Sequence, residues 1–344
     1  MNATRPDNQR PLLLVAVPCL NEEQTVARVV RDIPREIKGI GRVEVVVFDD
    51  GSTDATADRA RDAGAEVVSS KTNQGLGATF RDAVRVALSK GADIMVHIDG
   101  DGQFDPADIP LLIGPVISNQ ADMVTASRFL DRSLTPEMPL VKRWGNRSVA
   151  FIVRLLSGEN FKDVSCGFRA FSKETLLRMN LFGRFTYTQE SFLDLIFKKL
   201  TILEIPVSVR GVREFGESRV ASSIPRYAIR SLAIMFRAFI SYKPFKLFFA
   251  IASVFLVVGV ALLGFLGMHY LETGAFSPHI WAGFVGGSFS FFGFTTLITG
   301  LIGDMLVRMR LNQEEILYQL KRSRLEGRDS LADSSMSIGK LTDH

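Results

Sequence analysis

The stretch HIDGDGQFDP, from His97 to Pro106, places three aspartates close together at the end of an apolar run. Asp99 and Asp101 are two positions apart, so in an extended chain their side chains point to the same side. Two carboxylates in this arrangement raise each other's pKa unless a cation neutralises them. Mg²⁺ and Mn²⁺ suit such oxygen ligands, and Mg²⁺ typically binds one or two carboxylates together with substrate phosphates. The pair therefore predicts a metal site with Gln103 as a further oxygen ligand, and a plain acidic surface loop is the alternative.

Polar clusters also follow three earlier apolar runs, in the segments PCLNEE, DDGSTD and NQGLG. An aspartate at such a point can accept a hydrogen bond from a base N–H or a ribose hydroxyl. The glycines of NQGLG would let backbone approach a nucleotide, but Ala78, Thr79 and Phe80 follow Gly77 directly, so this is not the G-x-G-x-x-G fingerprint. Each cluster alone is typical of a turn, whereas four at successive strand ends predict a nucleotide-diphosphate site. Its candidate residues are Pro18, Asn21, Glu22, Asp50, Asn73, Gly75 and Asp99, and Asp49 and Asp54 surround Gly51 in the same turn as Asp50.

Apolar runs of strand length alternate with helical segments over the first half of the chain. We expect strands at 12–18, 43–50, 65–70, 93–99 and 122–128, and helices at 22–38, 52–64 and 76–91. Ser52 or Thr53 would cap the second helix, and Asp105 would cap the helix that begins at Pro106. Continuous apolar strands separated by helices predict an α/β fold with a mostly parallel sheet that is covered on both faces. Ligands bind beyond the carboxyl ends of such strands, where all four polar clusters fall.

The second half of the chain is less regular. We expect a helix at 148–158, a strand at 164–172, a helix at 193–200 and a strand at 202–210. Residues 222–243 predict an amphipathic helix at a membrane interface, because Arg226, Arg230 and Arg237 fall on one side and apolar residues on another. A soluble surface helix is the alternative. The polar residues 1–10 and 326–344 predict disordered ends.

Residues 246–307 predict a transmembrane hairpin of two helices. Between Leu247 and Val307 only Glu272 and Asp304 are charged, and this stretch holds two apolar runs of more than 20 residues each. A bilayer core needs about 20 helical residues, although a hydrophobic hairpin buried in a soluble core is an alternative. Lys and Arg flank the pair but are absent from the link ETGAFSPH, which places both flanks in the cytoplasm.

The composition and the N-terminal residues indicate in which compartment the domains lie and which partners are expected. The N-terminal residues MNATRPDNQR are polar and predict no signal peptide, so we expect a cytoplasmic domain at 11–221, a cytoplasmic juxtamembrane helix at 308–325 and both termini in the cytoplasm. Two cysteines, Cys19 and Cys166, suit a reducing compartment. The pI near 9.1 agrees with a surface that faces a membrane. No basic stripe with interleaved aromatics indicates nucleic acid.

The segments PCLNEE, DDGSTD, NQGLG, DGDGQFDP and CGFRAF, in this order and followed by the apolar pair, resemble the family 2 glycosyltransferases that act on polyprenyl phosphates. This branch includes the dolichol-phosphate mannose synthases and the bactoprenol glucosyltransferases, and the resemblance runs from about Leu12 to Arg324. It implies a GT-A fold, an NDP-sugar donor, Mg²⁺ or Mn²⁺, and inversion at the anomeric carbon. The resemblance further implies that Pro18, Asn21, Glu22 and Asp50 hold the nucleoside, and that Asp99, Asp101 and Gln103 hold the metal and the diphosphate.

A lipid phosphate is already largely ionised near neutral pH, so the acceptor needs cations rather than a strong base. In similar synthases, arginines at the positions that match Arg128 and Arg213 face the phosphates. These two therefore join Asp99 and Asp101 as the predicted catalytic set, and solvated surface charge is the alternative for each basic residue. The candidate acceptor cations are Arg128, Lys142, Arg143, Arg147, Arg213 and Arg219, and it stays open which of the 142–147 group contacts the acceptor.

Three other polar residues have weaker assignments. Glu190 would orient the sugar hydroxyls, pair with a cationic acceptor residue, or only complement the dipole of the helix that it begins. His97 is predicted to be a buried strand residue rather than a catalytic base. Arg169, in CGFRAF, is predicted to be a structural ion-pair partner.

The sequence therefore predicts an enzyme that transfers one sugar from an NDP-sugar to a polyprenyl phosphate at the cytoplasmic membrane face. UDP-sugars, such as UDP-glucose or UDP-N-acetylhexosamine, are favoured, and GDP-mannose is the alternative donor. A processive polysaccharide synthase is disfavoured, because Leu140 stands where its Q-x-x-R-W motif needs Gln. A non-catalytic membrane scaffold with a degenerate domain is the alternative from another class. Similar proteins with this hairpin form tetramers, so we expect a homo-oligomer.

Overall fold

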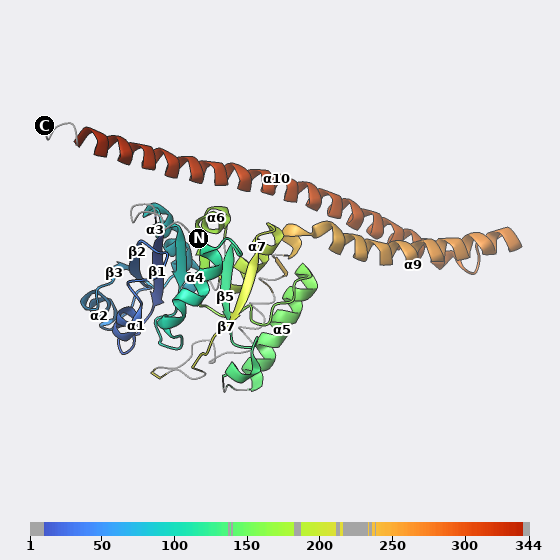
Figure 1. Ribbon diagram of the computed structural model, residues 1–344. Helices are drawn as coiled ribbons and strands as arrows, with labels where there is room; N and C mark the ends of the chain where they lie inside the picture. Colours follow the sequence, from blue (N-terminus) through green and yellow to red (C-terminus); the bar gives the residue numbers. More distant parts are fainter. Residues whose placement is uncertain are drawn as a thin grey trace. The chain divides into compact units, whose positions relative to one another are not determined.

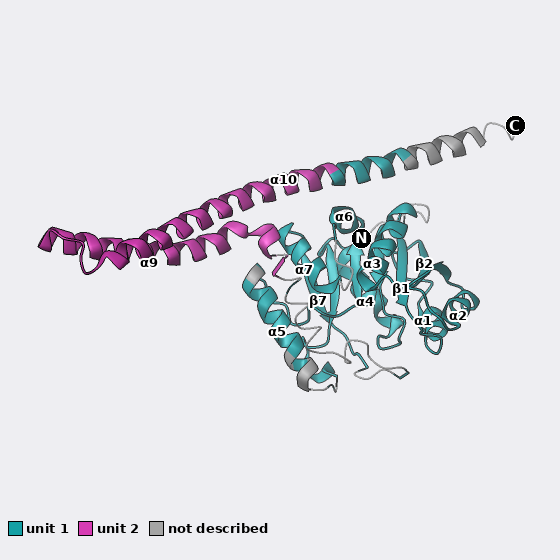
Figure 2. Ribbon diagram, turned by 180° about the vertical axis from the view of Figure 1, so that it is seen from behind, with its two compact units in different colours: residues 1–235, 317–344 teal, residues 236–316 magenta. Residues whose placement is uncertain are grey.

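The computed structural model describes residues 10–136, 138, 140–181, 187–210, 214–215, 233, 236–237 and 239–339. Within helices, the side chains of residues 140–142, 144, 156 and 328–339 lie outside this description. The chain divides into two compact units, one of residues 1–235 with 317–344 and one of residues 236–316 (Figure 2). The first unit carries the sheet and every candidate site residue that the structure describes.

A seven-stranded sheet forms the centre of the first unit, in the order β3-β2-β1-β4-β6-β5-β7 (Figure 1). All neighbouring pairs are parallel except those of β6, which runs antiparallel to both β4 and β5. The prediction of a mostly parallel sheet is therefore confirmed. The strands are β1 Leu12–Cys19, β2 Arg42–Asp49, β3 Glu66–Ser69, β4 Ile94–His97, β5 Met123–Ser127, β6 Arg169–Ser172 and β7 Ile202–Pro206.

Helices cover both faces of this sheet. Leu13, Val15 and Val17 of β1 pack in one core cluster with apolar residues of α1 and α4, while α3 contacts β1 and β2 and packs Phe80 against Phe171 of β6. Because successive strand residues point to opposite faces, a nearly continuous apolar strand such as β1 serves both layers. The helices of this unit are α1 Val26–Asp32, α2 Thr56–Asp62, α3 Leu76–Ser89, α4 Ile109–Ile117, α5 Leu140–Ser157, α6 Lys173–Arg178 and α7 Thr188–Phe197.

Several local expectations need correction. The strand expected at 164–172 begins only at Arg169, and the residues before it form a loop. The helix α6 was not expected, and the Ser172 hydroxyl caps it by accepting from Thr175 N–H. Neither Ser52 nor Thr53 caps α2, because the carboxylate of Asp54 accepts the N–H of Thr56 instead. Asp105 is confirmed as a cap, since it accepts from Ala107 N–H at the short helix Pro106–Asp108.

Two long apolar helices follow in the chain, α9 Pro244–Thr273 and α10 Ile280–Gly339. Both are long and apolar enough to cross a membrane, and only 11% of the most apolar window of each is buried. The juxtamembrane segment 308–325 lies within α10. Helix α10 continues to Gly339, into residues for which the polar composition predicts a disordered tail. The interfacial helix expected at 222–243 falls largely outside the described residues, as do residues 1–9 of the predicted N-terminal tail.

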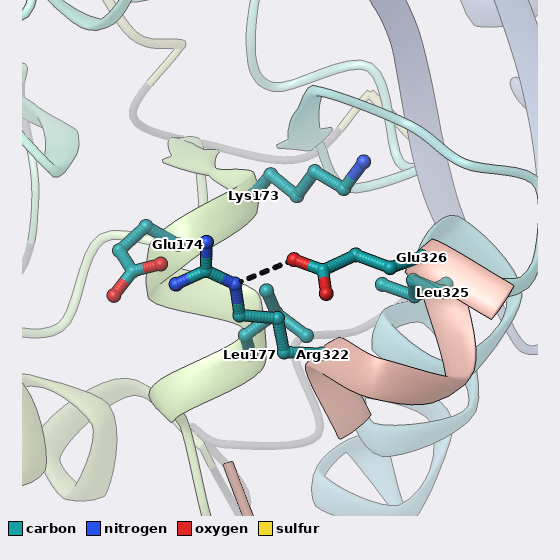
Figure 3. A pocket seen from close by; sticks show the side chains of 6 residues that line it. All are labelled: Lys173, Glu174, Leu177, Arg322, Leu325 and Glu326. Carbon is teal, nitrogen blue, oxygen red and sulfur yellow. Dashed lines mark hydrogen bonds and ion pairs between the residues drawn. The ribbon is translucent and has the colours of Figure 1, made fainter. Parts of the chain in front are cut away.

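The C-terminal part of α10 belongs to the first unit and packs against α6. Lys321 Nζ donates to the carbonyls of Leu177 and Met179, at 3.1 and 3.2 Å, and so covers the C-terminal end of α6. Helix α6 follows the antiparallel strand β6, so it begins at the amino ends of the parallel strands, where Lys173 N–H bonds Asp93 O. A cleft of about 340 Å³ lies here, at the opposite edge from the polar strand ends, and is lined by Lys173, Glu174, Leu177, Arg322, Leu325 and Glu326 (Figure 3).

Candidate functional site

The turns after β1 and β2 form one hydrogen-bonded corner. Asn21 adopts a positive φ of 53°, which aims its backbone N–H at Ser52 Oγ and its side-chain oxygen at Thr53 N–H, at 2.9 and 2.8 Å. Glu22 N–H donates to Thr56 Oγ1. Asn21 thus contacts the next turn, and it stays a prediction that it also holds a nucleoside.

Asp50 holds the loop that leads into α3. Its two carboxylate oxygens accept the backbone N–H groups of Gln74 and Gly75 at 2.7 and 2.9 Å. Asp50 is 6% exposed. Gly51 allows the turn after β2 to lie against the loop before α3, because a Cβ at this position would lie only 2.8 Å from the carbonyl carbon of Thr72. The predicted donor residues Asp50, Asn73 and Gly75 therefore share one corner of the sheet edge.

The neighbouring carboxylates have internal partners too. Asp49 is buried and accepts the N–H of Ser52, so it shapes the turn after β2. Asp54 accepts from Glu23 N–H as well as from Thr56. Burial raises the pKa of Asp54, but the hydrogen bonds from Thr56 and Glu23 outweigh it and hold the pKa below its ordinary value. Asp49 and Asp54 therefore order this corner.

Asp99 and Asp101 lie just beyond β4, which is the neighbour of β1 on the side away from β2. Asp101 is buried and accepts the N–H of Gln103 at 3.0 Å. The Asp99 carboxylate lies against the Cα of Gly167, since a Cβ on Gly167 would be 2.8 Å from Asp99 Oδ2. Gln103 uses its side-chain N–H to bind Arg210 O at 2.9 Å, so the structure gives it a contact with the segment after β7.

These carboxylates fit a divalent metal bound together with a diphosphate. Among the described residues there is no group of three or more His, Cys, Asp or Glu side chains that could hold an ion by themselves. Mg²⁺ rarely uses an all-protein cage and takes one or two carboxylates plus phosphate oxygens. Asp99 also rests in a space that exists only because residue 167 has no Cβ. Asp99 and Asp101 are thus the residues of this edge that would hold the ion, and Gln103 stays a prediction.

Arg128 follows β5 and is fixed by a buried carboxylate. Its Nε and Nη2 donate to the two oxygens of Asp163 at 2.7 and 2.9 Å, and Nη2 also reaches Ser165 Oγ. The Arg128 side chain is 22% exposed, whereas Asp163 is fully buried. Burial raises the pKa of Asp163, but the charge and hydrogen bonds of Arg128 outweigh this and lower it. The guanidinium therefore has a set orientation in a partly open position.

The other predicted acceptor cations divide into two groups. Arg143 and Arg147 of α5 are exposed, and the side chain of Lys142 lies outside the described residues. Arg213 and Arg219 also lie outside them. Asn146, between the two exposed arginines, binds the Lys162 carbonyl and accepts from Ser165 Oγ, which ties α5 to the loop that holds Arg128.

A buried polar cluster lies behind the site. His97 is fully buried, as predicted, and burial lowers its pKa to about 3, so it stays neutral. Arg169 is also fully buried and donates to the carbonyls of Val164, Cys166 and Thr188. Its partners in the described part of the chain are thus mainly carbonyls rather than the predicted ion-pair carboxylate. Glu190 lies in the first turn of α7, half-buried, and its role stays a prediction.

Sequence reasoning did not single out Asp163, Gly167 or Glu204. Glu204 of β7 accepts the backbone N–H groups of Lys162 and Asp163 at 2.8 and 2.7 Å. Burial raises the pKa of this carboxyl. The motif CGFRAF contains Gly167 and was a signal for this loop, but no spacing rule connects Asp163 to Arg128, 35 positions away.

The pattern of Glycosyl transferase family 2 matches residues 14–178, which includes the strand ends with Asp50, Asp99 and Asp101. An uncharacterized protein of Methanocaldococcus jannaschii is 32% identical over 66% of this chain and 93% of its own length. The chain belongs to glycosyl transferase family 2.

Within this family, the chain is similar to proteins with two different sugars in their names. A UDP-N-acetylglucosamine–dolichyl-phosphate N-acetylglucosaminyltransferase of Methanococcus voltae is 29% identical over 57% of this chain and 84% of its own. An undecaprenyl-phosphate mannosyltransferase of Micrococcus luteus is 27% identical over 63% of this chain and 90% of its own.

The fold of this family 2 chain also matches solved glycosyltransferase structures. Glucosyl-3-phosphoglycerate synthase from Mycobacterium tuberculosis, in complex with Mn²⁺, UDP-glucose and phosphoglyceric acid, aligns with a TM-score of 0.54 and 24% identity. The alignment covers 68% of this chain and 81% of that one. At this identity the likeness confirms the predicted GT-A-like fold.

Proposed function

We propose that this chain transfers one sugar, with inversion, from an NDP-sugar to the phosphate of a polyprenyl phosphate, and that the reaction needs Mg²⁺ or Mn²⁺. The observation that carries the proposal is the pair Asp99 and Asp101 at the carboxyl edge of a family 2 sheet, the same edge that holds the loop ordered by Asp50. The names of two relatives support the acceptor class, since one is a dolichyl-phosphate enzyme and the other an undecaprenyl-phosphate enzyme. Two candidate membrane spans agree with a lipid acceptor.

Each part of the site has a task in this reaction. The loop ordered by Asp50 presents backbone to the nucleotide, and Asp99 and Asp101 would hold the ion at the diphosphate end. When bound, the ion would supply charge stabilisation for the departing diphosphate. The acceptor phosphate is ionised and attacks the anomeric carbon without a strong base, so Arg128 and Arg213 are needed to position its oxygens and offset their charge.

The donor sugar follows less directly. UDP-sugars are favoured, and the relative from Methanococcus voltae carries UDP-N-acetylglucosamine in its name. GDP-mannose is the second candidate, because the relative from Micrococcus luteus is named a mannosyltransferase. The positive flanks of the apolar pair support a cytoplasmic site and cytoplasmic termini, and a homo-oligomer is part of the proposal.

A transfer assay with the purified full chain tests the proposal. Undecaprenyl phosphate and dolichyl phosphate are offered with labelled UDP-glucose, UDP-N-acetylglucosamine and GDP-mannose, in Mg²⁺, Mn²⁺ or EDTA. We expect a lipid-linked single sugar that EDTA abolishes. Absence of product with every donor would support the non-catalytic scaffold instead.

Two aspartates of one loop provide the matched variants. Asp101→Ala should abolish transfer while the protein stays folded, because it removes a carboxylate of the metal edge. Asp105→Ala should keep transfer near that of the wild type, because Asp105 is exposed and only caps the helix that follows. An active Asp101→Ala protein would refute the assignment.

A further inference from the structure

The loop from Asp163 to Gly167 touches both sides of the proposed reaction. At one end, Gly167 lies against the carboxylate of Asp99, on the metal and donor side. At the other end, Asp163 binds the guanidinium of Arg128, on the acceptor side. Asp163 and Gly167 are four positions apart, so this short loop connects the guanidinium of Arg128 with the carboxylate of Asp99. The relative placement of these two groups sets the distance between the proposed acceptor and donor.

The carboxylate of Asp99 occupies the space that a side chain at position 167 would need. A Cβ at this position would lie 2.8 and 3.2 Å from the two carboxylate oxygens and 3.3 Å from Asp99 Cγ. Real Cβ atoms do not approach oxygen as closely as 2.8 Å, so any other residue would displace the carboxylate. The backbone of Gly167 does not have a positive φ, so an alanine at this position would cause no backbone strain. The effect of Gly167→Ala should fall on Asp99.

The buried polar cluster fixes this loop from behind. The carbonyl of Gly167 accepts from Tyr187 OH at 2.9 Å and contacts His97 Nδ1 at 3.1 Å. Arg169 Nε and Nη2 donate to the carbonyls of Cys166 and Val164 at 2.9 and 3.0 Å. The side chains of His97, Arg169 and Tyr187 are fully buried. Three carbonyls of one short loop are therefore held by donors that solvent does not reach.

The acceptor end of the loop is fixed in a second way. Glu204 of β7 accepts the N–H groups of Lys162 and Asp163, and Ser165 Oγ accepts from Arg128 and donates to Asn146. These contacts hold the Asp163 carboxylate in the orientation that matches the Arg128 fork, a geometry that suits two parallel hydrogen bonds.

We infer that the 163–167 loop positions both reacting sides: Gly167 places Asp99 for the metal and diphosphate, and Asp163 places Arg128 for the acceptor phosphate. Asp163 and Gly167 are positioning residues, since each acts through another side chain. The inference rests on the proposed function for its acceptor half. Its metal half concerns Mn²⁺ and nucleotide binding, which can be measured without any acceptor.

The metal half is tested by Mn²⁺ binding to the full chain in the presence of UDP or GDP, followed by electron paramagnetic resonance. Gly167→Ala should weaken Mn²⁺ binding about tenfold or more, because residues that support metal ligands typically contribute 10- to 100-fold to affinity. Gly114→Ala, on α4 with nothing within 4 Å of the added Cβ, is the matched control and should bind as the wild type does. Equal Mn²⁺ binding by Gly167→Ala and wild type overturns this half. The half is also overturned if the wild type fails to bind Mn²⁺ in the presence of UDP and in the presence of GDP.

The acceptor half is tested by a double-mutant cycle in the transfer assay. Asp163→Asn should lower kcat by about 10- to 100-fold, as loss of alignment does, with nucleotide binding within twofold of wild type. On an Arg128→Lys background, which lacks the planar fork, Asp163→Asn should change kcat little. Additive effects overturn this half, because a purely structural role would act on either background.

A milder variant keeps the test decisive if Asp163→Asn does not fold. Ser165→Ala removes one contact of the Arg128 guanidinium and leaves the buried carboxylate in place. It should lower kcat by about threefold, the size expected for one lost hydrogen bond, with Mn²⁺ binding unchanged. A wild-type kcat would overturn the acceptor half. If the wild type transfers to no lipid at all, the proposed function fails, while the Mn²⁺ measurement still decides the role of Gly167.

Discussion

Asp50→Asn changes one atom of the side chain and should weaken donor binding. Both oxygens of Asp50 accept a backbone N–H, from Gln74 and Gly75, and the side chain is 6% exposed. The amide of asparagine has only one oxygen, so its –NH₂ group would face one of these two donors. The loop that starts α3 then loses a charge-assisted hydrogen bond and gains a repulsive contact.

The magnitude follows from the kind of bond that is lost. A hydrogen bond to a charged group contributes about 1.5–3 kcal/mol. If the nucleotide binds to the ordered loop, this free energy is lost from donor binding, and about 1.4 kcal/mol corresponds to a tenfold change in Kd. The nucleotide Kd should therefore rise by about 10- to 100-fold.

Isothermal titration with UDP and GDP in the presence of Mn²⁺ measures this change. Asp54→Asn is the matched control, because Asp54 lies in the same turn and its carboxylate accepts from Thr56 and from Glu23 N–H rather than from the α3 loop. The control should lower stability and leave the nucleotide Kd within about twofold. A nucleotide Kd for Asp50→Asn equal to that of wild type, or an equal loss in the control, refutes the reasoning.

The remaining predictions concern stability. Arg169→Leu should destabilise the first unit by about 3 kcal/mol or more, because backbone carbonyls in the core lose their donors, and an unchanged melting temperature would contradict this. The unfolded chain protonates His97 near pH 6.5, whereas the folded chain does so only near 3, so stability should fall as pH drops between these values, by about 2 kcal/mol at about pH 5. The melting temperature of His97→Gln should therefore depend less steeply on pH over this window, and equal slopes would exclude the effect. Lys321→Met should speed amide exchange in α6, since Lys321 covers the C-terminal end of that helix; exchange at the wild-type rate would show that α10 does not support it.

Sequence patterns sufficed for the parallel part of the sheet. The runs that predict β1 and β2 are long and apolar. The observed β1 ends one residue later than predicted, at Cys19, and β2 begins and ends one residue earlier, at Arg42 and Asp49. The strand expected at 164–172 was wrong over its first half, because VSCGF has strand-like composition but the carbonyls of Val164, Cys166 and Gly167 are bound by Arg169 and Tyr187 instead of a neighbouring strand. Propensity records composition, whereas strand formation depends on a partner with the matching register.

The helix caps show the same difference between features set by local sequence and features set by tertiary contacts. Asp105 was recognised, because an aspartate followed by proline at a helix start is a local signal. The cap of α2 was assigned to Ser52 or Thr53, but the corner with Asn21 uses their polar groups. Where a polar residue has two possible hydrogen-bond partners, tertiary contacts decide which one it binds, and the local sequence does not contain those contacts.

The sequence alone determined which groups stand at the carboxyl edge of the sheet. The order of strands and helices brings Asp50, Asp99 and Asp101 to one edge, and the two apolar helices follow from composition, because periodicity and hydrophobicity are local properties. The pairing of Arg128 with Asp163, and the fit of Asp99 against Gly167, arise only where β6 runs antiparallel between β4 and β5. These contacts join residues far apart in the chain, so their geometry exists only in the folded protein.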